Sequence, residues 1–319
     1  MGRNVIVCCD GTGNQYGPNN TNVVKLFEAA VKDAQQLAYY DPGVGTFSSQ
    51  AAIGPISRSV SRLMGKAFAS GLTRNIEDAY EYLMDHHEPD DRLFLFGFSR
   101  GAFTVRALAG MLHKCGLLQK GSRNLIPYAS RMYRHGDDEL AKGFKAAFSR
   151  ECKPHFIGVW DTVESVGWFW PRRFPNSRLN PDVLHGYHAL SIDEQRRKFR
   201  PNLWSPPASS QTIDQTWFAG VHSDVGGWYT EAGLSNIALH WMATAAHREG
   251  LRFQEGALTE FQNRGNALDT LHNSLLPWWW LLGWSRRKIP SGASIHPSVY
   301  ERMKGKPGYR PSNVPPQHA

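Results

Sequence analysis

The feature that most constrains the fold is a strand–turn–helix signature around residue 99. An apolar run at 92–96 predicts a buried strand, and residues 102–112 predict a helix. The turn between them, residues 97–101, reads GFSRG and matches the G-x-S-x-G pattern. In that pattern the serine stands at a sharp turn, and the glycines let strand and helix approach closely. We therefore expect Ser99 to be an exposed nucleophile, with a purely structural tight turn as the alternative.

The rest of the chain alternates between expected strands and expected helices. Strands are predicted at 5–9, 37–40, 155–160 and 215–221, and helices at 21–36, 75–87 and 234–247. Such alternation is typical of an α/β fold with a mostly parallel central sheet and helices on both faces. We expect residues 1–319 to form a single α/β-hydrolase-like domain, with cap or lid insertions around 120–150 and 265–295.

Four polar residues follow predicted strands, and parallel strands bring such residues to one edge of a sheet. They are Asp10, Ser99, Asp161 and His222. A serine hydroxyl needs a base, and the base needs an orienting acid. In α/β-hydrolases the chain order is serine, acid, histidine, which predicts Asp161 as the acid and His222 as the base. The backbone N–H of Arg100, at the start of the next helix, is the expected oxyanion donor.

Other residues compete for these roles. His296 also fits the chain order and is the rival base, and His188 is a weaker third candidate. Asp161 could instead cap a turn. Asp224 competes with it as the acid, although a role in organising the glycine-rich loop after His222 is the stronger expectation.

The loop DGTGN at 10–14 allows three interpretations. A phosphatase of the haloacid-dehalogenase type needs an aspartate two residues before Asp10, where this chain has Cys8. A dinucleotide loop needs a third glycine, where this chain has Tyr16. The favoured interpretation is an oxyanion loop, in which Gly11 or Thr12 offers a backbone N–H toward the serine, with a structural turn as the alternative.

Composition excludes several classes of function. No stretch has the length of a transmembrane helix, and the N-terminus lacks a signal-peptide pattern, so we expect a cytoplasmic protein, with export independent of a signal peptide still open. The four cysteines lack ligand or redox spacing and are expected to be buried free thiols. The net charge is +8, but basic clusters at 196–198 and 286–288 lack the aromatic pattern of nucleic-acid modules and suggest a solvated face. No metal-ligand motif is present, and no cofactor is expected.

Several motifs taken together resemble a known family. They are residues 7–14, 40–46, 97–102, 158–163, 188–194, 199–201 and 220–227. In this order they resemble a family of uncharacterised α/β-hydrolase-like domains that includes the G-x-S-x-G phospholipase effectors of type VI secretion. The resemblance implies a triad of Ser99, Asp161 and His222, and ester hydrolysis, with phospholipids as substrates of the effector members. Those effectors are longer and carry extra domains for membrane or carrier contact.

We therefore expect a serine hydrolase that cleaves carboxylic esters through an acyl-enzyme, as a lipid esterase or phospholipase. The alternatives are a non-catalytic binding domain on the same scaffold, or a phosphate-ester hydrolase that uses the Asp10 loop. The oligomeric state is left open.

A tryptophan run is the second pointer to lipid. Residues 277–284 read PWWWLLGW and precede the basic residues 286–288. The run could be a buried segment, an acyl-binding wall over the site, or an edge that makes peripheral contact with a membrane.

Overall fold

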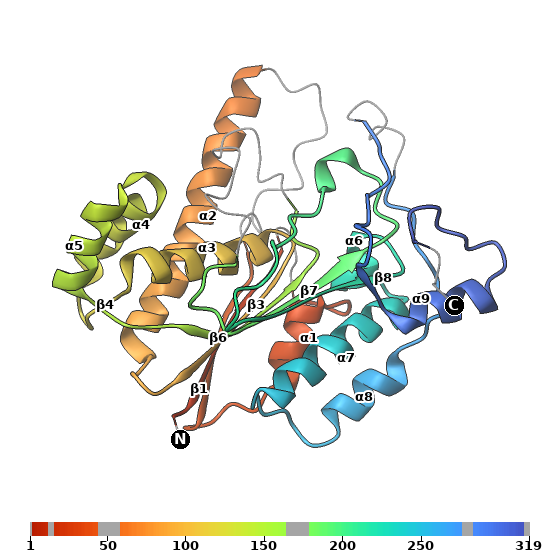
Figure 1. Cartoon of the computed structure of the whole chain (residues 1–319), viewed down its shortest axis with the longest axis horizontal. Coiled ribbons are helices and arrows are strands. Elements are labelled where there is room, and N and C mark those ends of the chain that lie inside the picture. Colours follow the sequence, from red (N-terminus) through yellow and green to blue (C-terminus); the bar gives the residue numbers. More distant parts are fainter. Residues whose placement is uncertain (1, 12–15, 44–57, 164–178, 276–282, 316–319) are drawn as a thin grey trace.

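A seven-stranded sheet in which every neighbouring pair of strands is parallel organises the molecule (Figure 1). The computed structural model describes residues 2–11, 16–43, 58–163, 179–275 and 283–315. The strand order is β2-β1-β3-β6-β7-β8-β9. In chain order the strands are β1 (Asn4–Cys9), β2 (Gln36–Asp41), β3 (Arg92–Phe98), β6 (Pro154–Trp160), β7 (His185–Ser191), β8 (Thr212–Phe218) and β9 (Ser294–Ile295). This arrangement confirms the predicted α/β fold.

Helices cover both faces of the sheet, as predicted. They are α1 (Asn22–Ala29), α2 (Arg58–His86), α3 (Arg100–Cys115), α4 (Ile126–His135), α5 (Asp138–Phe148), α6 (His222–Gly226), α7 (Gly233–Arg248), α8 (Ala257–Arg264) and α9 (Pro297–Gly305), with short 3₁₀ turns at Arg123–Leu125 and Arg197–Phe199. Figure 1 shows α1, α7 and α8 on one side of the sheet and α2 and α3 on the other.

The sequence of the central strands explains why both faces are covered. Successive residues of a strand point to opposite faces. In β1, Val5 and Val7 pack in the cluster under α2 and α3, whereas Ile6 and Cys8 pack in the cluster under α1 and α7. All four side chains are fully buried. An apolar run that is buried on both faces is typical of the centre of a parallel sheet.

Some predicted boundaries are wrong, and two strands of the sheet, β7 and β9, were not predicted. The helix expected through residue 36 ends at Ala29, because Gln36 pairs with Asn4 at the start of β2. Strand β8 ends at Phe218, so His222 begins the short helix α6 instead of ending a strand. Strand β7, which was not predicted as a strand, lies between β6 and β8.

Residues after α3 fold back onto its C-terminal end. The hairpin β4 (Leu117–Leu118) and β5 (Ser149–Arg150) encloses α4 and α5. Lys114 Nζ donates to the Gly136 carbonyl (2.7 Å), and Lys145 Nζ donates to the His113 carbonyl (2.9 Å). These contacts lie at the opposite end of α3 from Ser99. The cap function expected for 120–150 stays a prediction.

None of the helices in the described part of the chain is both long enough and apolar enough to cross a bilayer.

Candidate active site

The serine turn is built by two close backbone approaches. A Cβ at Gly97 would lie 2.5 Å from the Gly101 carbonyl oxygen, and a Cβ at Gly101 would lie 1.9 Å from the Cys9 carbonyl oxygen. Between them Ser99 has φ 55° and ψ −115°, a backbone conformation that residues other than glycine rarely adopt. The strain is held because β3 and α3 are packed from both sides. Ser99 is half-buried and precedes the first residue of α3.

A second strained residue follows the neighbouring strand. Asp161 comes directly after β6, has φ 44° and is fully buried. Its backbone N–H donates to the Ala189 carbonyl (2.8 Å). The carbonyl of the preceding residue, Trp160, accepts from the Ser99 N–H (3.1 Å). The backbone therefore ties the serine turn directly to the strand end that carries the carboxylate.

His222 meets this carboxylate. Its Nδ1 lies 2.6 Å from Asp161 Oδ2, and since a carboxylate accepts, Nδ1–H is the donor. The imidazole packs against Phe98, with ring centroids 4.7 Å apart, and against Phe199 at 5.0 Å. Phe98 is the residue before Ser99, so the ring is held beside the serine turn. Among the described residues no hydrogen bond is made by Nε2, the nitrogen that a general base would use.

Arg287 completes the surroundings of Asp161. Its Nη1 and Nη2 donate to Asp161 Oδ1 (2.5 Å) and Oδ2 (2.9 Å), and they also donate to the carbonyls of Ser191 and Phe199. Burial alone would raise the pKa of Asp161. The charge of Arg287 and the hydrogen bonds from His222 and Arg287 outweigh burial and hold that pKa far below its usual range. Asp161 is therefore a permanent anion.

Strand β7 supplies two further donors to the carboxylate. Ser191, its last residue, donates from N–H to Asp161 Oδ1 (2.9 Å) and from Oγ to Oδ2 (3.2 Å). With His222 and Arg287, these donors satisfy both carboxylate oxygens. A buried carboxylate is stable only when it is paired in this way.

Glu194 is a second buried carboxylate beside the histidine. It accepts from the His222 N–H (3.3 Å), from Arg196 Nε (2.9 Å) and from Ser274 Oγ (3.1 Å). Burial alone would raise its pKa, but the hydrogen bond and charge of Arg196 hold the pKa below its usual value. Glu194 thereby fixes the backbone at the start of α6.

Backbone strain is concentrated at this edge of the sheet. Across the described residues, positive φ at non-glycine positions occurs at Ser99, Asp161 and Trp228. The third of these follows α6, the helix that begins with His222. Strain of this kind persists where function requires a fixed geometry, and it supports this edge as the candidate site.

The Asp10 loop lies against the serine turn through the contact of Gly101 with Cys9. Asp10 Oδ2 accepts from Thr21 Oγ1 (2.6 Å) and Tyr40 OH (3.1 Å), and Oδ1 accepts from the Gly11 N–H (2.6 Å). The Gly11 N–H is therefore engaged by its own neighbour and is not aimed at a substrate. Thr12 lies outside the described residues.

The remaining candidates make hydrogen bonds to residues other than His222 and Asp161. His296 caps α9, with Nδ1 2.8 Å from Ser298 Oγ, and burial lowers its pKa to about 4. His188 is fully buried, and its Nε2 accepts from the Thr162 N–H (3.2 Å). Asp224 accepts from the Val221 N–H (3.0 Å) and lies 2.6 Å from His272 Nδ1, so it organises the loop around α6.

Sequence reasoning missed Arg287, Ser191 and Glu194. Arg287 stood in a basic cluster expected on a solvated face, and that expectation is wrong for this residue, which is 5% exposed. Its neighbours Arg286 and Lys288 are exposed. That the middle residue of this basic cluster is buried becomes evident only once the fold places it beside Asp161. Ser191 and Glu194 lie within the family motif at 188–194, which did not indicate a role for either of them, and no local motif marks Arg287.

The profile of one family, described as the catalytic domain of Tle1-like phospholipase effectors of the type VI secretion system, matches residues 3–245. An uncharacterized protein of Saccharomyces cerevisiae is 37% identical over 225 residues, which are 64% of this chain and 33% of that protein. This chain therefore spans about a third of that relative's length.

Two solved structures are partly similar to this chain. An uncharacterized protein from Pseudomonas aeruginosa has a TM-score of 0.49 and 20% identity, over 88% of this chain and 48% of that chain. The Tle1 effector, solved bound to the VgrG spike of the type VI secretion system, has a TM-score of 0.41 and 18% identity, over 73% of this chain and 52% of that chain.

Proposed function

Because the chain belongs to the Tle1-like family of type VI secretion phospholipase catalytic domains, we propose that it is a serine hydrolase that cleaves carboxylic ester bonds of lipids. The observation that carries the proposal is the contact of 2.6 Å between His222 Nδ1 and Asp161 Oδ2 beside the strained Ser99 turn. A buried carboxylate that orients an imidazole next to a serine is the arrangement that activates a hydroxyl nucleophile.

The chemistry follows from these roles. Ser99 Oγ attacks the ester carbonyl carbon while His222 Nε2 takes the hydroxyl proton. The tetrahedral intermediate collapses, the bond between carbonyl carbon and alcohol oxygen breaks, and the proton passes to the leaving alcohol. Water then attacks the acyl-Ser99 ester by the same route, which releases the acid and restores the serine.

The oxyanion of the intermediate needs backbone donors at the start of α3. The amides of a first helical turn have no acceptor within the helix, and its dipole favours negative charge there. We assign the Arg100 N–H as one donor. Since the Gly11 N–H donates to Asp10, we assign the Thr12 N–H as the second donor.

Arg287 keeps the acid ionised. The usual role of the acid is to orient the imidazole and to stabilise the imidazolium that forms during catalysis. The guanidinium lowers the pKa of Asp161 against the effect of burial, so the carboxylate keeps its charge. Arg287 is thus a positioning residue that acts through Asp161.

Two alternatives have less support. A phosphate-ester hydrolase that uses the Asp10 loop has Cys8 where that chemistry needs a carboxylate, and this thiol is fully buried with a raised pKa, chiefly because of burial. A non-catalytic binding domain would keep the fold without a reactive serine, and a direct probe of that serine separates it from the enzyme.

A fluorophosphonate probe tests the proposal. The wild-type chain should be labelled at one serine, and Ser99→Ala should abolish the label. Ser210→Ala, which changes an exposed serine in a turn, is the matched control and should be labelled like the wild type. Release of fatty acid from phosphatidylcholine vesicles should follow the same order. A folded wild-type chain that takes up no probe would refute the enzyme and favour the binding domain.

A further inference from the structure

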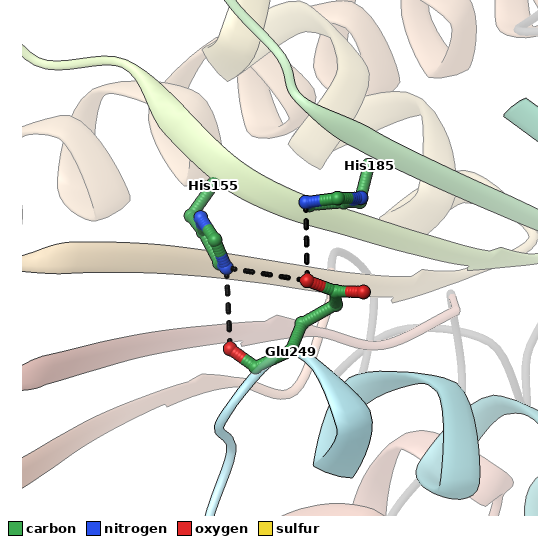
Figure 2. Close-up of side chains that lie close together, drawn as sticks. All are labelled: His155, His185 and Glu249. Atoms are coloured by element: carbon green, nitrogen blue, oxygen red, sulfur yellow. Dashed lines mark hydrogen bonds and ion pairs between the residues drawn. The ribbon is translucent and has the colours of Figure 1, made fainter. Parts of the chain in front are cut away.

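Two histidines and a glutamate converge at the edge of the sheet opposite Ser99. His155 is the second residue of β6, His185 is the first residue of β7, and Glu249 is the C-cap of α7. Figure 2 shows the two imidazoles on neighbouring strands, with the Glu249 side chain reaching toward both. The sheet is parallel, so these amino-terminal strand ends lie a strand's length, roughly 20 Å, from the strand ends that carry the catalytic residues.

The distances match those among the ligands of one metal ion. His155 Nε2, His185 Nε2 and a Glu249 carboxylate oxygen all lie within 4.8 Å of one another. His185 Nε2 is 3.1 Å and His155 Nε2 is 3.9 Å from Glu249 Oε2. Ligands of a tetrahedral zinc ion, bound at about 2.1 Å, stand about 3.4 Å apart. Small side-chain rotations would therefore bring the three atoms onto one ion.

We propose that His155, His185 and Glu249 form a binding site for a divalent transition-metal ion, with Zn²⁺ as the ion of best fit. Two imidazoles and one carboxylate suit zinc, and water would fill the open position. The three side chains are 19%, 22% and 27% exposed, so an ion can enter from solvent. The imidazole rings meet edge to face at 69°, which lets both nitrogens point at one ion.

Packing fixes the ring of His155 beside the other two ligands. The ring lies edge-on against Phe94, with centroids 5.4 Å apart. A neutral imidazole is the form that coordinates a metal. On binding, Nε2 must give up its proton to Nδ1 and leave its contact of 3.2 Å with the Glu249 carbonyl.

One neighbour opposes the site. Arg92 Nη1 donates to the Glu249 carbonyl (3.3 Å) and places a positive charge beside the ligands. This charge weakens the attraction for a cation, so removing it should strengthen binding. Bound metal would fasten the end of α7 to β6 and β7, a stabilising role that is separate from hydrolysis.

Metal titration of the tag-free full chain, stripped with EDTA and dialysed, tests the site. Calorimetry with ZnCl₂ should show saturable binding of one ion per chain, and Co²⁺ should give the strong visible bands of a four-coordinate complex. His155→Ala, His185→Ala and Glu249→Gln should each weaken Zn²⁺ binding by at least about tenfold. Arg92→Gln should strengthen it.

The matched control is His113→Ala, which removes a histidine paired with a single carboxylate, Asp182, at 2.6 Å. It should bind Zn²⁺ like the wild type. Zn²⁺ should raise the melting temperature of the wild type without changing its rate of ester hydrolysis. The proposal is wrong if the wild type shows no saturable site and only six-coordinate Co²⁺ bands, or if all three ligand variants bind as tightly as the wild type.

Discussion

Three side chains carry the proposed chemistry, two from the residues that follow β3 and β6 and one from the start of α6, and each can be removed singly. Ser99→Ala, Asp161→Ala and His222→Ala should each lower kcat by roughly 10³-fold or more, and double variants should lose little beyond the worst single variant. Steady-state hydrolysis of a soluble ester measures this. Retained activity in His222→Ala, with loss in His296→Ala, would move the base assignment to His296.

The contribution of Arg287 should be measurable in the pH dependence of kcat/KM. A protonated imidazole cannot accept the serine proton, so kcat/KM falls on the acid side. Arg287→Gln removes the charge that does most to lower the pKa of Asp161, so Asp161 should be protonated at a higher pH and the acid limb of kcat/KM should move to higher pH. Arg287→Lys keeps a charge and should shift the limb less while lowering kcat through lost geometry.

Arg287→Gln also leaves the buried carboxylate of Asp161 without its cationic partner. Removing one partner of a buried ion pair costs about 3–5 kcal/mol of stability. Urea unfolding of the same variants separates that loss from the kinetic effect. An acid limb that stays in place for a folded Arg287→Gln chain would show that Arg287 is only structural.

At the scale of elements, sequence periodicity predicted the strands that are apolar on both faces and the G-x-S-x-G turn. It did not predict β7, because residues such as His185 and Tyr187 interrupt its apolar pattern. Without β7 the donors on Ser191 cannot be placed beside Asp161. Arg287 and Asp161 are 126 positions apart in the chain, and only the folded sheet brings them together. The ligands of the proposed metal site also come from three separate segments, so no spacing motif could mark them.

The tryptophan run belongs to this scale as well. Residues 276–282 lie outside the described part of the chain, so the acyl-wall, membrane-edge and buried-segment interpretations of the run remain predictions. Nearby described residues reach the site: Ser274 bonds to Glu194, and Arg287 bonds to Asp161. The cap or lid expected around 265–295 stays a prediction.

If the run lines the acyl pocket, longer acyl chains should be better substrates. Each buried methylene contributes about 0.8 kcal/mol at most, so the six extra methylenes of p-nitrophenyl octanoate set an upper limit of roughly 3,000-fold over the acetate in kcat/KM. We expect an increase of roughly several hundred-fold, because burial in the pocket is incomplete. Trp279→Ala or Trp280→Ala should reduce that ratio while leaving acetate hydrolysis nearly intact. A preference for acetate would remove the support that this run gives to a lipid substrate.

For the whole molecule, the packing of both faces of the sheet predicts how fast the cysteine thiols react. Cys8, Cys9, Cys115 and Cys152 are all free and buried, in agreement with the sequence expectation. Burial raises the pKa of Cys115 to about 11 and that of Cys152 to about 12, and it raises the others further. At pH 8 the native protein should therefore show no fast-reacting thiol toward Ellman's reagent, and all four should react in guanidinium. One rapid native thiol would mean that a face of the sheet opens to solvent.

The counter-charge on Asp161 sets a limit for protein engineering. The recognisable family segment, residues 3–245, contains the proposed nucleophile, acid and base, but Arg287 lies beyond it. A designer who transplanted only that segment into another scaffold would carry over each of these groups and leave behind the cation that pairs with Asp161 in the interior. On the proposed function, the segment that homology detects is therefore shorter than the segment that a working transplant needs.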